Sequence, residues 1–142
     1  MEISEVRRRV RATVEQARRQ AAERRTRGDD AAREYGQFLE RVAVPIVHQL
    51  AIALNAEGHR FTVQTPEDRV RLLSERSGDD YVELVLDSQR DEPAVVVRAS
   101  RGRGRRMLTS ERDLQPGKPI AELTEDDVVD GVLADALPLI ER

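Results

Sequence analysis

The sequence contains no cysteine and no tryptophan, and only 3% of its residues are aromatic. Without cysteine the chain cannot form a disulfide, a thiolate metal site or a cysteine nucleophile. The scarcity of aromatic side chains leaves few surfaces on which nucleic-acid bases could stack. No apolar run approaches the roughly 18 residues of a membrane-spanning helix, and the amino terminus lacks the apolar core of a signal peptide. We therefore expect a cytoplasmic protein that does not enter a membrane.

The chain is long enough and apolar enough for one folded domain. Leu, Ile, Val and Phe account for about a quarter of its 142 residues, above the level of roughly 20% below which chains tend to be disordered. Because aromatic residues are rare, the core must be built mainly from valine, leucine and alanine. We predict a single domain over residues 1–142.

Charge is distributed unevenly behind a formal net charge of −3. Residues 1–27 hold nine arginines and four glutamates, whereas residues 121–137 hold six acidic residues and no basic one. These two segments could attract each other, either within one chain or between two chains.

The first 27 residues show the apolar spacing of an amphipathic helix. Its apolar positions recur about every 3.6 residues and are Ile3, Val6, Val10, Val14, Ala17 and Ala21. Three glutamates, each followed four residues later by an arginine, support this helix from its solvent side. Gly28 followed by Asp29 and Asp30 is typical of a helix end and of the N-cap of a second helix.

A second apolar stripe of the same period runs over Tyr35–Leu54. Pro45 falls inside it, and because the stripe keeps its phase we expect a kink rather than a break. A tight turn after the first helix then predicts an antiparallel helical hairpin over residues 1–57. In the register set by that turn, Val10 faces Val47.

From residue 60 the apolar period changes to that of β-strands. The candidate strands are Phe61–Thr65, Val70–Glu75, Tyr81–Asp87, Ala94–Ser100 and Arg106–Glu111. Short turn-like connections between neighbours predict an antiparallel sheet over residues 60–111. The alternation of apolar and polar residues indicates that one face of this sheet is buried.

Residues 124–137 form the last predicted element, a helix. Thr124 followed by three acidic residues is typical of an N-cap and first helical turn, and Pro138 is expected to end the helix. The order of elements predicts an α+β fold. It consists of the helical hairpin, an antiparallel meander of about five strands, and a C-terminal helix packed on the same sheet face.

The sequence contains no recognisable catalytic or metal-binding motif. His48 and His59 have no second ligand at metal-binding spacing, and the HExxH pattern is absent. A serine could be combined on paper with either histidine and an acid, but no spacing favours one combination. Asp126, Asp127 and Asp130 lack the glycine and the bidentate glutamate of a calcium loop. We therefore expect no catalytic residues, no metal and no other cofactor.

Two clusters of arginine are the strongest functional features. The first lies in a glycine-containing run that predicts a hairpin tip between two strands, and its members are Arg101, Arg103, Arg105 and Arg106. The second is a row along the first helix and consists of Arg7, Arg11, Arg18 and Arg25. Each cluster is compatible with an ordinary solvated surface, with phosphate binding, or with docking on an acidic protein surface.

The favoured hypothesis is a small, non-enzymatic protein-interaction or adaptor module that forms a homo-oligomer or binds another protein. The alternative is a nucleic-acid-binding protein that contacts phosphates through residues 101–106 and the basic first helix. The negative net charge and the lack of aromatic residues count against this alternative.

Overall fold

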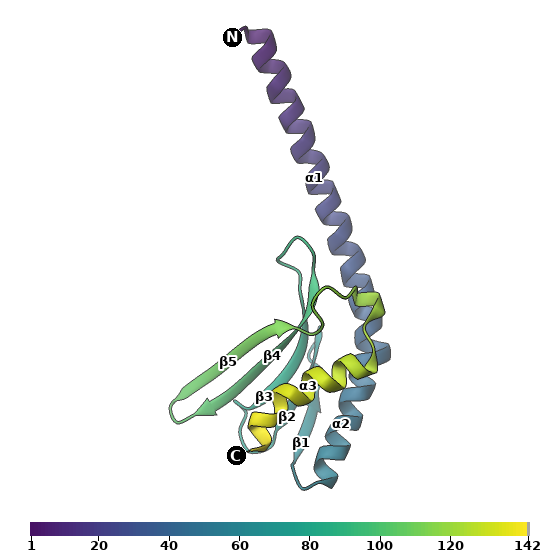
Figure 1. The fold of residues 1–142 in the computed structure, drawn as a ribbon, viewed down its shortest axis with the longest axis vertical. Helices are drawn as coiled ribbons and strands as arrows, with labels where there is room; N and C mark the ends of the chain where they lie inside the picture. The colour runs from purple at the N-terminus through teal and green to yellow at the C-terminus, as the bar shows by residue number, and fades with distance from the viewer. Residues whose placement is uncertain (142) are drawn as a thin grey trace.

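The computed structural model describes residues 1–141 and shows an α+β fold (Figure 1). The helical elements are α1 (Ile3–Phe38), the π-helical segment η1 (Leu39–Ala43), α2 (Val44–Ala56), the 3-10 turn η2 (Ile120–Glu122) and α3 (Glu125–Ile140). The strands are β1 (Phe61–Gln64), β2 (Arg69–Ser74), β3 (Tyr81–Asp87), β4 (Ala94–Arg103) and β5 (Arg106–Asp113). As predicted, α2 and α3 share one core on one face of the sheet.

The predicted helical hairpin is wrong, because α1, η1 and α2 form one continuous helical rod from Ile3 to Ala56. Gly28 keeps helical geometry, since the only glycines with positive φ among the described residues are Gly58, Gly104 and Gly117. A glycine inside a helix costs only about 1 kcal/mol. The apolar stripe that would have faced the first helix is instead buried against the sheet and α3.

The rod continues through Pro45, as predicted. Proline has no N–H, so the carbonyl four residues earlier, on Arg41, loses its usual helical partner. The π-helical segment η1 ends just before the proline, and such segments are a recognised way in which a helix accommodates a local interruption.

The five strands form a meander in the order β1-β2-β3-β4-β5, with every neighbouring pair antiparallel. The five predicted strands are confirmed. Tyr81–Asp87 has the predicted bounds, and the other four differ from prediction by one to three residues at an end. The β4–β5 hairpin is paired from Val96 with Asp113 to Arg103 with Arg106. Almost the whole of β5 is exposed, because this edge strand extends beyond the helices that cover the other strands.

Helix α3 begins as predicted but ends later. The Thr124 hydroxyl accepts a hydrogen bond from the Asp127 N–H (3.3 Å), and the Asp127 carboxylate accepts one from the Thr124 N–H (2.9 Å). Pro138 was expected to end the helix, and that expectation is wrong, since α3 continues to Ile140. Continuing the helix places Leu139 in the core, where its burial is worth about 2 kcal/mol and offsets much of the cost of the proline.

The C-terminal part of α1 is anchored to the sheet by two aromatic residues. Tyr35 and Phe38 are both buried, and the Tyr35 hydroxyl donates a hydrogen bond to the Asp68 carbonyl (2.6 Å). Burial, followed by the nearby Asp68 carboxylate, raises the pKa of Tyr35. The hydroxyl therefore remains a donor throughout the ordinary pH range.

The N-terminal part of α1 leaves the domain. Residues 3–26, here called the arm, are exposed or half-exposed along their whole length. The first side-chain hydrogen bond from α1 to the rest of the domain is made by Arg27, whose Nε donates to the Asp91 carbonyl (3.2 Å). At 1.5 Å per residue the arm is about 36 Å long, and Figure 1 shows it extending away from the sheet.

The continuous rod makes different predictions for two valines that the hairpin would have paired. Val10→Asp should change the free energy of unfolding by less than about 0.5 kcal/mol, because Val10 is 56% exposed. Val47→Asp should cost several kcal/mol, because Val47 is 1% exposed. Denaturant titration followed by circular dichroism, at low protein concentration, measures both. Equal losses of stability would contradict the exposed position of the arm.

Candidate functional site

The arm carries an exposed apolar seam along one face. The seam consists of Ile3, Val6, Val10, Val14, Ala17 and Ala21. Its first four members are 69%, 43%, 56% and 40% exposed. Each of its first three positions recurs eleven residues later, and eleven residues make three helical turns, so the seam runs almost parallel to the helix axis. A straight, exposed seam of this length is suited to a second helix lying alongside it.

Arginines border this seam. At about 100° per residue, Arg7, Arg18 and Arg25 lie roughly 60–80° round the helix from Val10, and Arg11 lies next to them. The structure thus brings together all four arginines predicted on the first helix. None of the four forms a side-chain hydrogen bond or ion pair with any of residues 1–141.

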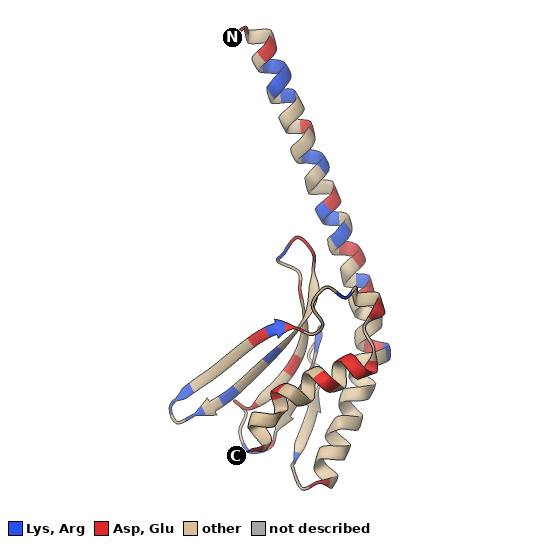
Figure 2. Ribbon diagram, in the orientation of Figure 1, with Lys and Arg blue, Asp and Glu red and all other residues tan. Residues whose placement is uncertain are grey.

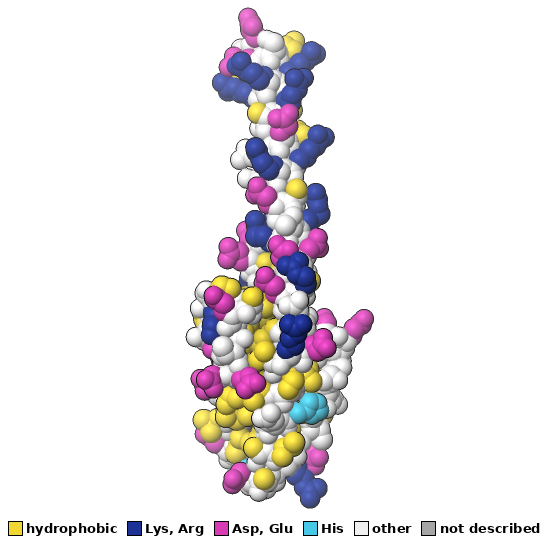
Figure 3. Space-filling view, turned by 90° about the vertical axis from the view of Figure 1, so that its right-hand side faces the viewer, with side chains coloured by type: hydrophobic (Ala, Val, Ile, Leu, Met, Phe, Trp, Pro, Cys, Tyr) yellow, Lys and Arg dark blue, Asp and Glu magenta, His cyan; other side chains and the backbone are white. Residues whose placement is uncertain are grey.

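The glutamates of the arm lie on its opposite face. Glu5, Glu15 and Glu23 are each roughly 140° round the helix from Val10. Glu5 accepts a hydrogen bond from Arg9 (3.0 Å) at the predicted spacing, on the side away from the seam. The side chains beside the seam are therefore mainly cationic, although the arm as a whole contains both signs of charge (Figure 3).

The second arginine cluster occupies the tip of the β4–β5 hairpin, as predicted. Gly104 has φ +63° and Arg105 a negative φ, the pattern of a type II′ turn with glycine at its first central position. The Gly102 N–H donates to the Asp80 carboxylate (2.8 Å), which anchors the base of the hairpin. Arg103 and Arg106 face each other across the two strands, although like charges in that position are destabilising.

The two clusters do not form one surface. Figure 2 shows the basic arm at one end of the molecule and the β4–β5 tip on the far side of the sheet. The eight predicted arginines therefore belong to two separate sites of four, and no single short ligand contacts both within one chain.

Sequence reasoning missed an exposed face on α3. Val128, Val132 and Ala136 of this helix are fully buried, whereas Leu133 and Leu137 are 37% and 53% exposed. The apolar residues of α3 come in adjacent pairs, so the helix has a wider apolar stripe than one sheet face can cover. These adjacent apolar pairs are the signal in the sequence from which the exposed apolar face of α3 could have been predicted.

A groove separates α3 from β5. It contains two cavities of about 270 Å³ and 210 Å³, and Arg112 lines the first of them. Arg112 donates to the Gly131 carbonyl (2.9 Å) and to the Asp135 carboxylate (3.3 Å). Gly131 permits this close approach of helix and sheet, since a Cβ there would lie 2.6 Å from Leu114 Cδ1.

Acidic side chains line the α3 wall of this groove. Asp127 and Asp130 line the first cavity and Asp135 the second. The second oxygen of Asp135, Oδ2, is buried and has no hydrogen-bond partner among residues 1–141. Arg112 thus satisfies one oxygen of this carboxylate and leaves the buried one unpaired.

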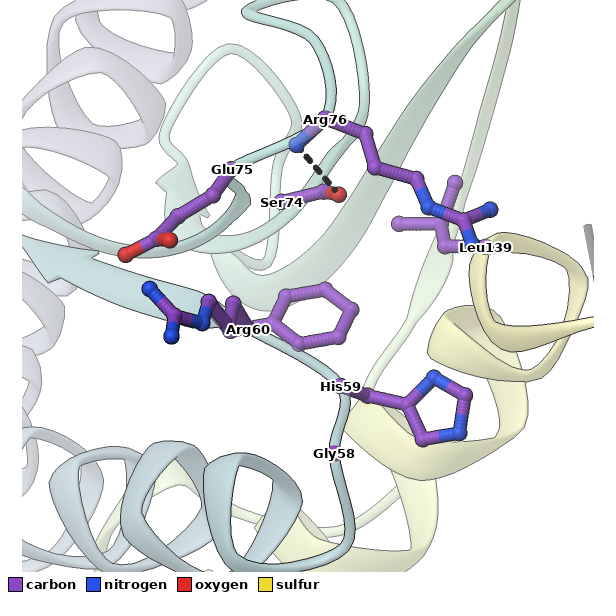
Figure 4. Close-up of a pocket in the computed structure, with 8 residues that line it drawn as sticks. Gly58, His59, Arg60, Ser74, Glu75, Arg76 and Leu139 are labelled. Atoms are coloured by element: carbon purple, nitrogen blue, oxygen red, sulfur yellow. Dashed lines mark hydrogen bonds between the residues drawn. The ribbon is translucent and has the colours of Figure 1, made fainter.

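A different cavity, of about 360 Å³, lies near the start of β1 and is lined by both Ser74 and His59 (Figure 4). The Ser74 hydroxyl accepts a hydrogen bond from the Arg76 N–H (3.3 Å). The imidazole of His59 points away from Ser74 in Figure 4. The cavity therefore does not present a serine activated by a histidine.

Residues 1–141 contain no group of three or more His, Asp or Glu side chains placed to hold a metal ion. Within the same residues no helix has both the length and the apolar character needed to cross a membrane. Comparison with known protein families, curated proteins and solved structures finds no match to this chain.

The acidic wall of the groove generates a pH prediction. Lys118 donates to Asp127 Oδ2 (2.6 Å), and this hydrogen bond lowers the pKa of Asp127. A lowered pKa in the folded state stabilises the protein above the unfolded value near 4, and this stabilisation is lost as the pH falls through the folded pKa.

Lys118→Met should therefore reduce stability at pH 7 by about 0.5–1 kcal/mol, the range for a partly exposed ion pair. The difference from the unmodified protein should shrink as the pH falls from about 5 to about 3. Glu67→Gln is the control, since Glu67 is exposed and forms no hydrogen bond or ion pair with residues 1–141. Thermal denaturation over this pH range measures the effect, and a pH-independent loss for Lys118→Met would contradict it.

Proposed function

We propose that this chain is a non-enzymatic protein-interaction module that uses its arm to bind an acidic, amphipathic helix. The observation that carries this proposal is the exposure of Ile3, Val6, Val10 and Val14 on a helix that leaves the domain. A soluble helix normally buries such a seam. The proposed compartment is the cytoplasm. Proteins of oxidising compartments often contain disulfides, and this chain has no cysteine with which to form one.

The energetics favour a partner that is charged as well as apolar. Covering the four exposed side chains would contribute about 1 kcal/mol each, since roughly half of each is in water. Association costs about 4–15 kcal/mol in lost motional freedom. The free energy gained by covering the seam only equals the lower limit of that cost. The arginines beside the seam must therefore also contribute to binding.

The same arginines determine which kind of helix fits. Two arms packed seam to seam would bring Arg7, Arg18 and their neighbours close to the like charges of the other arm, which opposes association. A helix with its own apolar stripe bordered by Asp or Glu would instead pair each arginine with an opposite charge.

Site-specific photo-crosslinking in living cells tests this function. The photoreactive residue p-benzoylphenylalanine is placed at Val10, on the seam, or at Ala12, which lies about 200° further round the helix. We expect a protein adduct from position 10 and little or none from position 12. Equal adducts at both positions, no protein adduct, or an adduct to nucleic acid would each contradict the proposal.

A second candidate function is phosphate binding by the β4–β5 tip. It is favoured by one observation, the placement of Arg103 directly opposite Arg106 without any acid to pair with either among residues 1–141. A chain that tolerates this repulsion gains a focused positive patch, which is able to attract a polyanion despite the negative net charge.

This candidate predicts a specific salt dependence. Four phosphate contacts on duplex DNA give a slope of log affinity against log salt of about −3.6. Changing all four arginines of residues 101–106 to serine should remove that slope equally for all sequences, because backbone contacts do not read bases. The matched control changes Arg7, Arg11, Arg18 and Arg25 to serine. Titration of a labelled duplex followed by anisotropy measures both, and absence of binding at physiological salt excludes the candidate.

A further inference from the structure

We propose that the partner of the arm is a second copy of this chain, and that the arm of one copy packs on the exposed face of α3 of the other. This face, here called the α3 face, consists of Asp126, Asp130, Leu133 and Leu137. The inference rests on the proposed function and commits to the α3 face, and not to a second arm, as the receiving site.

The α3 face has apolar surface for the seam. Leu133 and Leu137 stand one helical turn apart and are exposed. At about 100° per residue, the four members of the α3 face lie within roughly 60° of one another round the helix. A helix with a seam of valine and isoleucine can pack along such a face.

The charges of the α3 face and the arm are complementary. Residues 121–137 carry six acidic side chains and no basic one, while residues 1–27 carry nine arginines and four glutamates. Asp126 and Asp130 lie one turn apart on α3, are exposed, and form no ion pair within residues 1–141. They are free to receive the arginines that border the seam.

The α3 face that receives the arm must belong to another copy. The arm is the continuation of a rigid rod whose other end is packed into the core, and it leads away from its own α3 (Figure 1). Bending it back would require breaking the helix. An arm of about 36 Å is long enough to cover the whole of a second copy's α3, which is about 24 Å long.

The other exposed apolar surface of the chain is a poorer match for the arm. The outer face of α2 includes Ile52, which is 69% exposed, and Figure 3 shows hydrophobic side chains gathered over this part of the molecule. However, Val44–Ala56 contains no Asp or Glu. It has no partner for the arginines beside the seam.

Charge reversal of the two surfaces, separately and together, tests the inference. In the arm variant, Arg7, Arg11 and Arg18 are changed to glutamate. In the α3 variant, Asp126 and Asp130 are changed to arginine. The control variant changes Glu67 and Glu92 to arginine, since both are exposed and neither is paired among residues 1–141. Light scattering measures the mass of each full-length protein, and circular dichroism confirms that each is folded.

We expect the unmodified protein and the control variant to be larger than a monomer. The arm variant and the α3 variant should each associate at least about tenfold more weakly, because each brings like charges together. An equimolar mixture of these two variants should regain the complex. In that mixture each reversed arm meets a reversed α3 face, and each unmodified arm meets an unmodified α3 face.

Three results would overturn the inference: a monomeric unmodified protein, an α3 variant that associates normally, or a mixture that does not recover. The photo-crosslinking experiment separates these results from failure of the proposed function. A seam-specific adduct to a different protein keeps the proposed function and rejects the second copy. An adduct of twice the mass of the chain supports both.

Discussion

The rod formed by α1, η1 and α2 is buried in the core at one end, and because it is rigid this burial keeps the arm at its other end in solvent. Tyr35 and Phe38 fix the rod against the sheet, and the Tyr35 hydroxyl is tied to the Asp68 carbonyl at 2.6 Å. Because the helix is continuous, its direction is set inside the domain and is carried outward by backbone hydrogen bonds. The exposure of the seam, the position of its arginines and the distance of the arm from its own α3 all depend on this anchoring.

Charges are paired on the sheet but are largely unpaired, and of opposite sign, on the arm and on α3. The outer sheet face is neutralised locally, since the buried Glu83 accepts hydrogen bonds from Arg69 (3.2 Å) and Arg71 (2.9 Å). The arm and α3 lack such pairing across most of their length. Unpaired charges of opposite sign at two ends of a chain favour contact between chains, and the apolar residues beside them provide area to bury.

Much of the fold could be predicted from local patterns. The five strands, their antiparallel order and the N-cap at Thr124 follow from alternation and turn chemistry over a few residues. The hairpin could not be decided in the same way. Gly28 is compatible with a turn or a helix interior at a difference of about 1 kcal/mol, and packing contributes more than that. The groove could not be predicted either, because Arg112, Gly131 and Asp135 meet only when β5 and α3 are brought together.

The sequence by itself determined that the first helix is amphipathic and bordered by arginine, since helical period and residue type are local properties. It also determined the basic and acidic segments at the two ends. Only the tertiary structure decided what each apolar stripe packs against. The stripe of α2 faces the sheet because the sheet offers more apolar area than a thin helix, and this leaves the seam of the arm with no surface of its own chain to cover it.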